Sequence, residues 1–168
     1  MPEIRFNPGD FVVYPAHGVG QITDIQVTAI AGQNLELIAI NFNKDKLTLR
    51  IPLSNARKTG LRRVVSPETM DSAIKVLKEK SKTKRVQWSK RSQEYTLKIN
   101  SGDPIAVAEV LRDLFKDPSK KEQTYSERQI FEQAMARLAA EYAVVNKVKE
   151  EVANVRLSDI LYGKLIAA

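Results

Sequence analysis

The hydrophobic period of the chain changes once, near residues 62–67, and this change constrains the fold more than any other feature. Before it, short runs rich in β-branched and aromatic residues stand between turn signals, as in FVVY at Phe11–Tyr14 and LTLRIP at Leu47–Pro52. After it, apolar residues recur at helical spacing between capping signals. We therefore expect an α+β chain, with an all-β module over residues 1–64 and an all-α module over residues 65–168.

Turn signals divide the first module into short strands. Proline and glycine mark a turn at 7–10, Gly32 marks a second, and the polar run 43–46 marks a third. Strands are expected between these turns and, as a candidate fifth, near the end of the module: Phe11–Tyr14, 22–28, 35–42, Leu47–Pro52 and 61–65. Short strands with turns at this spacing predict a small barrel of the SH3 or Tudor type.

Capping signals divide the second module into a bundle of about five helices. A capping side chain before proline, or a capping box, is typical of a helix start. The expected starts lie at Ser66-Pro67, near Trp88, at Asp103-Pro104, at Thr124 and near residue 149. Glycine favours a helix end at Gly102 and, for the last helix, at Gly163.

The positive charge of the chain is concentrated in its middle quarter. The net charge is +7, and residues 57–98 hold thirteen lysines and arginines against four acidic residues. The segments on either side each have one more acidic than basic residue. A localised basic block is typical of a protein that binds a polyanion such as nucleic acid. A solubilising lysine-rich linker is the alternative.

The residue inventory argues against catalysis. The chain has no cysteine and one histidine, His17, which cannot alone supply the three or four ligands of a metal site. No serine or threonine is indicated as a nucleophile beside it. The glycines of Gly18-Val19-Gly20 precede a strand pattern, whereas a phosphate cradle needs a helix there. We expect no catalytic residue, no metal, no cofactor and no small-molecule substrate, and therefore a protein that is not an enzyme.

The apolar segments are short. No apolar run approaches the roughly 18–20 residues that cross a bilayer, and residues 1–6 lack the apolar core of a secretory signal. We therefore expect no membrane partner and a cytoplasmic location.

Trp88, the only tryptophan, lies inside the basic block. An aromatic ring among cations at a helix start is suited to stacking on bases or wedging between them. However, Trp88, Tyr95 and Ile99 also share one helical stripe, so the ring could equally belong to a buried core. The spacing alone leaves both interpretations open.

Arg50 lies in the alternating run LTLRIP. On an edge strand, such a residue could fix the register of a partner that binds by strand addition. An ordinary arginine on the solvent face of a two-faced strand is the simpler interpretation from the sequence pattern.

At these motifs the chain resembles the CarD/CdnL family of bacterial RNA polymerase-binding transcription regulators. The similar segments are FVVYPAHGVG from residue 11, LTLRIP from residue 47, QWSKR from residue 87, and SGDPIAVAEVLRDL from residue 101. The first module alone also fits the polymerase-binding module of transcription-repair coupling factors. The helical half and Trp88 favour the CarD family.

The resemblance implies a function for each module. The β module would dock on the polymerase β subunit, and the resemblance assigns polymerase binding to Thr48, Arg50, Ile51 and Pro52. The helical module would bind promoter DNA largely independently of sequence, with Trp88 in the minor groove at the upstream edge of the melted bubble. Its other DNA-binding residues would be Arg85, Lys90, Arg91 and Arg128. The protein would be associated with the bacterial nucleoid through polymerase.

Two positions depart from the family pattern. Thr28 stands where some members have an arginine that faces polymerase, and Ser92 replaces an aromatic residue. A second hypothesis is an RNA- or ribosome-associated basic protein, since small barrels joined to basic helices also bind RNA. Single-stranded RNA recognition would favour several exposed aromatic residues, whereas one tryptophan dominates the basic block.

Overall fold

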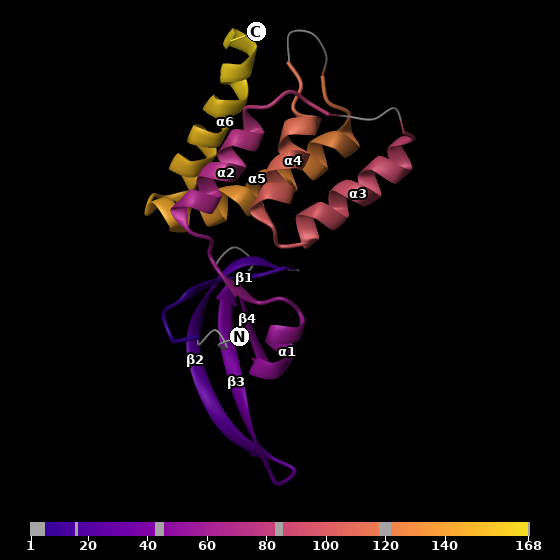
Figure 1. The fold of residues 1–168 in the computed structure, drawn as a ribbon. Coiled ribbons are helices and arrows are strands. Elements are labelled where there is room, and N and C mark those ends of the chain that lie inside the picture. The colour runs from indigo at the N-terminus through magenta and orange to yellow at the C-terminus, as the bar shows by residue number, and fades with distance from the viewer. Residues whose placement is uncertain (1–5, 16, 43–45, 83–85, 118–121, 168) are drawn as a thin grey trace. The chain divides into compact units, whose positions relative to one another are not determined.

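A computed structural model describes residues 6–15, 17–42, 46–82, 86–117 and 122–167. The chain forms two compact units, Met1–Val64 and Val65–Ala168, and each is described by itself (Figure 1). The first contains an antiparallel sheet and one short helix, and the second contains only helices among its described residues. The expected α+β class is confirmed.

The first unit, which we call the β unit, is a five-stranded antiparallel sheet with the order β4-β3-β2-β1-β5. Its strands are β1 (Phe11–Tyr14), β2 (Gly18–Ile30), β3 (Gln33–Phe42), β4 (Leu47–Pro52) and β5 (Arg62–Arg63). Strands β2 and β3 form a long hairpin, and Ala31 and Gly32 at its tip both have positive φ. This conformation matches the tight turns that suit the right-handed twist of paired strands. The strand order places β4 at one edge of the sheet.

The core of the β unit lies on one face of the sheet. Ile38, Ile40 and Phe42 alternate along β3 and are almost fully buried. Helix α1 (Leu53–Lys58) adds Leu53 and Ala56 to the same apolar cluster. The sequence pattern did not predict α1, because six residues are too few to show helical periodicity.

Strand β5 is shorter than the predicted strand at 61–65. Only Arg62 and Arg63 pair with β1, and the preceding Leu61 is buried in the apolar cluster. An ion pair of 3.4 Å between Arg63 Nη2 and Asp10 Oδ2 accompanies this short ladder.

The second unit, which we call the helical unit, contains α2 (Pro67–Leu77), α3 (Trp88–Asn100), α4 (Pro104–Leu114), α5 (Tyr125–Asn146) and α6 (Glu150–Ala167). The capping predictions are confirmed: Ser66 and Asp103 each accept a backbone N–H, and Thr124 and Glu127 form a capping box. Gly102, with φ of 77°, follows the end of α3. The described part of the chain contains no helix long and apolar enough to cross a membrane.

The predicted end of the last helix at Gly163 was wrong, because α6 continues to Ala167. A glycine ends a helix when it takes a left-handed conformation, and Gly163 is not among the residues with positive φ. At the end of α5 the left-handed position is instead occupied by Lys147, with φ of 55°.

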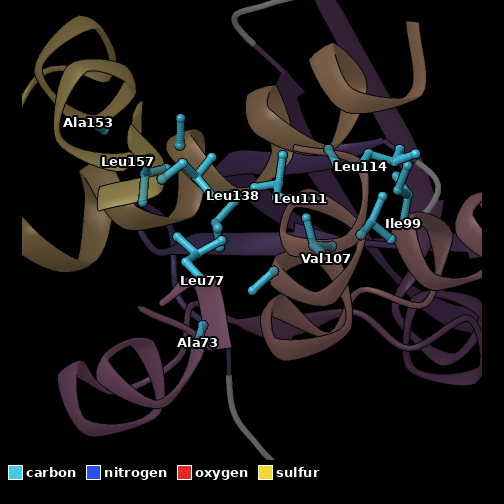
Figure 2. Packing of buried hydrophobic residues seen from close by; sticks show 14 of the residues in the cluster. Ala73, Leu77, Ile99, Val107, Leu111, Leu114, Leu138, Ala153 and Leu157 are labelled. Carbon is cyan, nitrogen blue, oxygen red and sulfur yellow. The ribbon is translucent and has the colours of Figure 1, made fainter. Parts of the chain in front are cut away.

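The apolar core of the helical unit is built around α4, as Figure 2 shows. Val107, Leu111 and Leu114 of α4 are buried against residues from the other helices. Leu138 of α5 and Leu157 of α6 belong to the same cluster. Helix α4 buries seven of its eleven residues, whereas α3 buries only two of its thirteen, Tyr95 and Ile99.

Candidate nucleic-acid and protein interfaces

The edge strand β4 presents two different faces. Leu49 and Ile51 are partly buried and pack against the apolar cluster of the β unit. Thr48 and Arg50 alternate with them and are exposed. Of the four predicted polymerase-binding residues, therefore, only Thr48 and Arg50 offer an exposed side chain. The side chain of Ile51 packs on the core. Pro52 is partly buried and lacks a backbone N–H for strand pairing.

Arg50 lies on a face that continues across the sheet. Its register partner on β3 is Ala39, and the partner of Ala39 on β2 is Asp24. Thr28 lies on the same face of β2, since it is four positions after Asp24 and side chains alternate between the two faces. Arg50 has no ion-pair partner among the described residues. Its guanidinium is therefore available to a partner molecule.

Trp88 is the first residue of α3, directly after the N-cap Gln87. The indole is partly buried, packs against the apolar core, and lies 6.2 Å from the ring of Tyr95 between centroids. The indole thus packs on the core but is not fully buried, and its contact with DNA stays a prediction.

Arg91 lies against both aromatic rings. Its Cζ atom is 5.5 Å from the Trp88 ring centroid and 5.7 Å from the Tyr95 ring centroid. Its Nη2 donates a 3.1 Å hydrogen bond to the Tyr95 hydroxyl. The Nε atom is buried and has no hydrogen-bond partner in the described part of the chain. These contacts fix the guanidinium beside the indole and orient the ring through cation–π attraction.

The other predicted DNA-binding residues are distributed differently. Lys90 is exposed in the first turn of α3, beside Trp88, while Arg85 lies outside the described residues. Arg128 is exposed near the start of α5, where it lines a pocket of about 290 Å³ together with aromatic side chains that include Phe115. No hydrogen bond, ion pair or ring contact joins Arg128 to Trp88 or Lys90 among the described residues. The structure therefore packs Arg91 on the Trp88 ring, leaves Lys90 exposed on the same turn of α3, and places Arg128 on another element.

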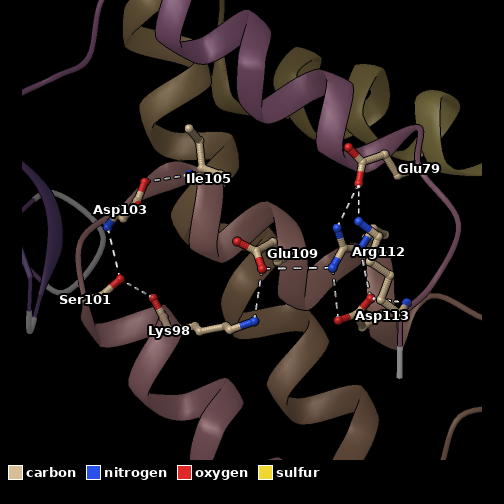
Figure 3. A network of polar contacts seen from close by, with 9 residues as sticks. Glu79, Lys98, Ser101, Asp103, Ile105, Glu109, Arg112 and Asp113 are labelled. Carbon is tan, nitrogen blue, oxygen red and sulfur yellow. Dashed lines mark hydrogen bonds and ion pairs between the residues drawn. The ribbon is translucent and has the colours of Figure 1, made fainter. Parts of the chain in front are cut away.

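Arg112 on α4 is the centre of a buried network that the sequence pattern did not indicate (Figure 3). The guanidinium contacts three carboxylates: Nε bonds Asp113 Oδ1 at 2.9 Å, Nη1 bonds Glu79 Oε2 at 3.1 Å, and Nη2 lies 4.0 Å from Glu109. Burial alone would lower the pKa of Arg112. The hydrogen bond with Asp113 and the three negative charges outweigh burial, so the pKa is raised.

A second buried pair holds the start of α5. Glu127 Oε1 accepts a 2.8 Å hydrogen bond from Lys116 Nζ and also accepts the backbone N–H of Thr124. Burial acts to raise the pKa of Glu127, but the hydrogen bonds and the charge of Lys116 outweigh it, so the pKa lies below its usual value. This pair fixes the end of α4 to the start of α5, the turn that carries Arg128.

The histidine and glycines of the first motif have structural environments. The His17 ring stacks on Tyr14 with 5.5 Å between centroids and lies 5.3 Å from the Phe42 ring. A Cβ atom at Gly20 would lie 2.6 Å from Ile40 Cγ2, so only glycine fits there. Strand β2 begins at Gly18, so a strand and not a helix N-terminus carries this motif, but both glycines lie inside the strand rather than before it. The described residues contain no cluster of three or more potential metal ligands.

Comparison with known proteins identifies relatives along most of the chain. A family described as the CarD-like/TRCF RID domain matches residues 6–65, and one described as CarD, C-terminal domain, matches residues 72–158. The "Putative transcription factor YdeB" of Bacillus subtilis (strain 168) is 26% identical over 146 residues, which cover 87% of this chain and 95% of that protein.

Among solved structures, the solution NMR structure of the 72-residue N-terminal domain of Myxococcus xanthus CarD is 28% identical. The match covers 38% of this chain and 84% of that one, with a TM-score of 0.31. The two family matches follow one another in order, and the C-terminal match alone spans more than half of the sequence. This chain therefore belongs to the CarD family.

Proposed function

We propose that this chain is a non-enzymatic transcription regulator that binds the β subunit of bacterial RNA polymerase and stabilises the open promoter complex. Membership of the CarD family supports the broader part, which is transcription regulation through polymerase. The observation that carries the finer part is the start of α3, where a partly exposed Trp88 lies beside an exposed Lys90. The proposed activity needs no cofactor.

The β unit supplies the polymerase contact. Strand β4 is an edge strand with an exposed arginine that has no ion-pair partner in the described residues. An edge strand offers unpaired backbone groups, and a strand of the β subunit could add to it. Arg50 and Thr48 would then select the partner by side-chain contacts on one face. The inward residues Leu49 and Ile51 hold the strand in register on the core.

The start of α3 supplies the DNA contact. An apolar ring inserted between base steps of the minor groove costs a few kcal/mol of unstacking in intact duplex. At the edge of a melted bubble the stacking is already lost, so the ring binds the open complex better than the closed one. Only such differential affinity can shift the equilibrium. A difference of about 1.4 kcal/mol changes the ratio of open to closed complexes tenfold.

Arg91 and Lys90 support the ring in different ways. The exposed ammonium of Lys90 can contact a phosphate, which gives sequence-independent and salt-dependent affinity. Arg91 lies against Trp88 and Tyr95, so its first role is to hold the indole at the angle in which it meets DNA. Arg128 would contact a phosphate from the first turn of α5.

The two units cooperate through tethering. Docking of the β unit on polymerase raises the local concentration of the helical unit at the promoter, so that weak intrinsic DNA affinity is sufficient. The degenerate pattern of the minor groove makes the contact largely independent of sequence.

The decisive experiment measures the lifetime of polymerase–promoter open complexes with the wild-type chain, with Trp88→Ala, and with no added protein. We expect the wild type to lengthen the lifetime and the variant to lose that effect while it still binds polymerase. Tyr125→Ala is the matched control, because it removes an aromatic ring that is 75% exposed on α5. Equal lifetimes in all samples, with polymerase binding intact, would show that the chain acts at another step.

Thermal unfolding of the same variants is needed, since Trp88 also packs on the core. We expect Trp88→Ala to lose about 1–2 kcal/mol of stability, below the range for a fully buried ring. Trp88→Phe retains a ring against Tyr95, so its stability should stay closer to that of the wild type. Its smaller ring reaches less far into the groove, so it should lengthen the open-complex lifetime less than the wild type does.

A further inference from the structure

Helix α3 carries Trp88 but is weakly held by apolar packing. Of its thirteen residues only Tyr95 and Ile99 are buried, and Leu97 is 71% exposed. A wedge must enter the groove at a fixed position, because small displacements lose most of the benefit of a preorganised contact. The position of α3 therefore needs a further source.

The network of Arg112 reaches the chain before α3. Asp113 Oδ1 accepts both the Arg112 Nε–H and the backbone N–H of Lys82, each at 2.9 Å. The Ser81 hydroxyl donates a 3.4 Å hydrogen bond to the backbone carbonyl of Asp113, and Glu79 Oε2 accepts a hydrogen bond from Arg112 Nη1. The segment after α2 is thus attached to α4 up to Lys82, six residues before Trp88.

The same network reaches the far end of α3. Glu109 Oε2 accepts a 3.1 Å hydrogen bond from Lys98 Nζ and lies 4.0 Å from Arg112 Nη2. Lys98 is in the last turn of α3. Figure 3 shows these contacts converging on one side of α4. Lys82, which precedes α3, and Lys98, near its end, are therefore each bonded to a carboxylate that also contacts Arg112.

Arg112 is itself fixed by its burial and by its partners. Its side chain is 6% exposed and Asp113 is 7% exposed, so solvent screens their attraction little. The planar guanidinium can contact several carboxylates at once, which the ammonium of lysine cannot do with the same geometry.

We propose that Arg112 is a positioning residue for Trp88. It holds the chain that follows α2 as far as Lys82 and, through Glu109, the last turn of α3, and so sets where the indole lies when the helical unit meets DNA. This inference rests on the proposed function for its consequence, but the orientation of Trp88 can be measured in the free protein.

The test uses the intrinsic fluorescence of Trp88, the only tryptophan of the chain. In Arg112→Lys, we expect the acrylamide quenching constant to rise roughly twofold and the anisotropy to fall, because α3 opens locally. We expect Arg112→Lys to lengthen the lifetime of open complexes less than the wild type does, while polymerase binding through the β unit is unchanged. Leu157→Ala is the matched control, since it removes buried packing on α6 without touching the network.

All variants are compared at a temperature at which circular dichroism shows them folded. Should Arg112→Lys fail to fold, Glu79→Ala tests the same idea at a side chain that is 45% exposed, with the exposed Asp71→Ala as its control on α2. Unchanged quenching in the folded variant would overturn the inference. A rise in quenching with no effect of the wild type on open complexes would sustain the positioning role and overturn the proposed function instead.

Discussion

The two units fix the residues that we propose as contact sites by different means. The three buried charged residues among the described positions, Arg112, Glu127 and Glu141, all belong to the helical unit. In the β unit, hydrogen bonds between strands set the position of every residue along β4, and Arg50 projects from that ladder without a buried partner. A helix satisfies its backbone groups internally, so its position relative to its neighbours depends on side chains.

Because of this difference, different substitutions should displace the proposed contact residues of the two units. The position of Arg50 depends on strand register and on the apolar face beneath β4. The position of Trp88 depends on its packing against Tyr95 and the core and, by the proposal above, on the polar contacts of Arg112. Changes in the apolar face beneath β4 should therefore displace Arg50, and changes in the charges around Arg112 should displace Trp88.

The largest effect is expected from the core of the β unit. Ile40 on β3 is fully buried, and Ile40→Ala should lower the free energy of unfolding of that unit by about 2–5 kcal/mol. Val27→Ala, at a side chain that is 65% exposed on β2, should change it by less than about 0.5 kcal/mol. Amide hydrogen exchange followed by NMR reports on both units separately. Equal loss of protection in the helical unit would contradict separate stabilisation of the two units, because they would then unfold together.

The second prediction concerns the partner of β4. Arg50→Glu reverses a charge on the exposed face and should weaken polymerase binding by about 2–5 kcal/mol, as for a charge at the centre of an interface. Lys58→Glu makes the same charge change at an exposed position outside β4, the last residue of α1, and should leave binding within a fewfold of wild type. Titration of labelled protein with purified polymerase measures both. Equal affinity of Arg50→Glu and wild type would remove β4 from the interface.

Sequence reasoning predicted the parts of the fold that depend on local signals. Alternation gave the strands around the central hairpin, and the capping residues Ser66, Asp103 and Thr124 marked helix starts that the structure confirms. Helix α1 was missed because it is a single short segment held by Leu53 and Ala56 in a core assembled from distant strands.

The candidate site was predictable to a similar extent. The spacing of Trp88 and Tyr95 indicated a shared stripe, and the ring contact is present. The network of Arg112 was not predictable, because Glu79 lies 33 residues away and meets Arg112 only through helix packing. The buried Glu127 was recognised as part of a capping box, but its partner Lys116 lies on the other side of a connecting segment.

The third prediction tests the dependence of the helical unit on charge. Glu127 has a lowered pKa in the folded chain, so it contributes stability at pH values above the unfolded value of about 4.3 and loses that contribution as the pH falls through the folded pKa. Glu127→Gln should therefore lose about 1–2 kcal/mol at pH 7 and show a smaller further loss on acidification than wild type. Glu132→Gln, at an exposed position of α5, is the control.

Urea unfolding at pH 7 and at pH 3, followed by Trp88 fluorescence, measures these differences. Wild type and Glu127→Gln should approach each other in stability at the lower pH. A difference that is independent of pH would assign the stabilisation to shape and packing rather than to the charge of Glu127.

The smallest effect is expected at Gly163, where a helix continues through a residue that usually ends one. A Cβ atom there meets nothing within 4 Å, and the backbone has no positive φ, so Gly163→Ala should raise helix stability by about 0.5–1 kcal/mol. Gly20→Ala is the opposite case, since its Cβ would overlap Ile40 and Phe42 and should destabilise the β unit by about 1–3 kcal/mol. Thermal unfolding checks both signs. Destabilisation by Gly163→Ala would mean that α6 ends before this residue in solution, and the prediction from the sequence would then be correct.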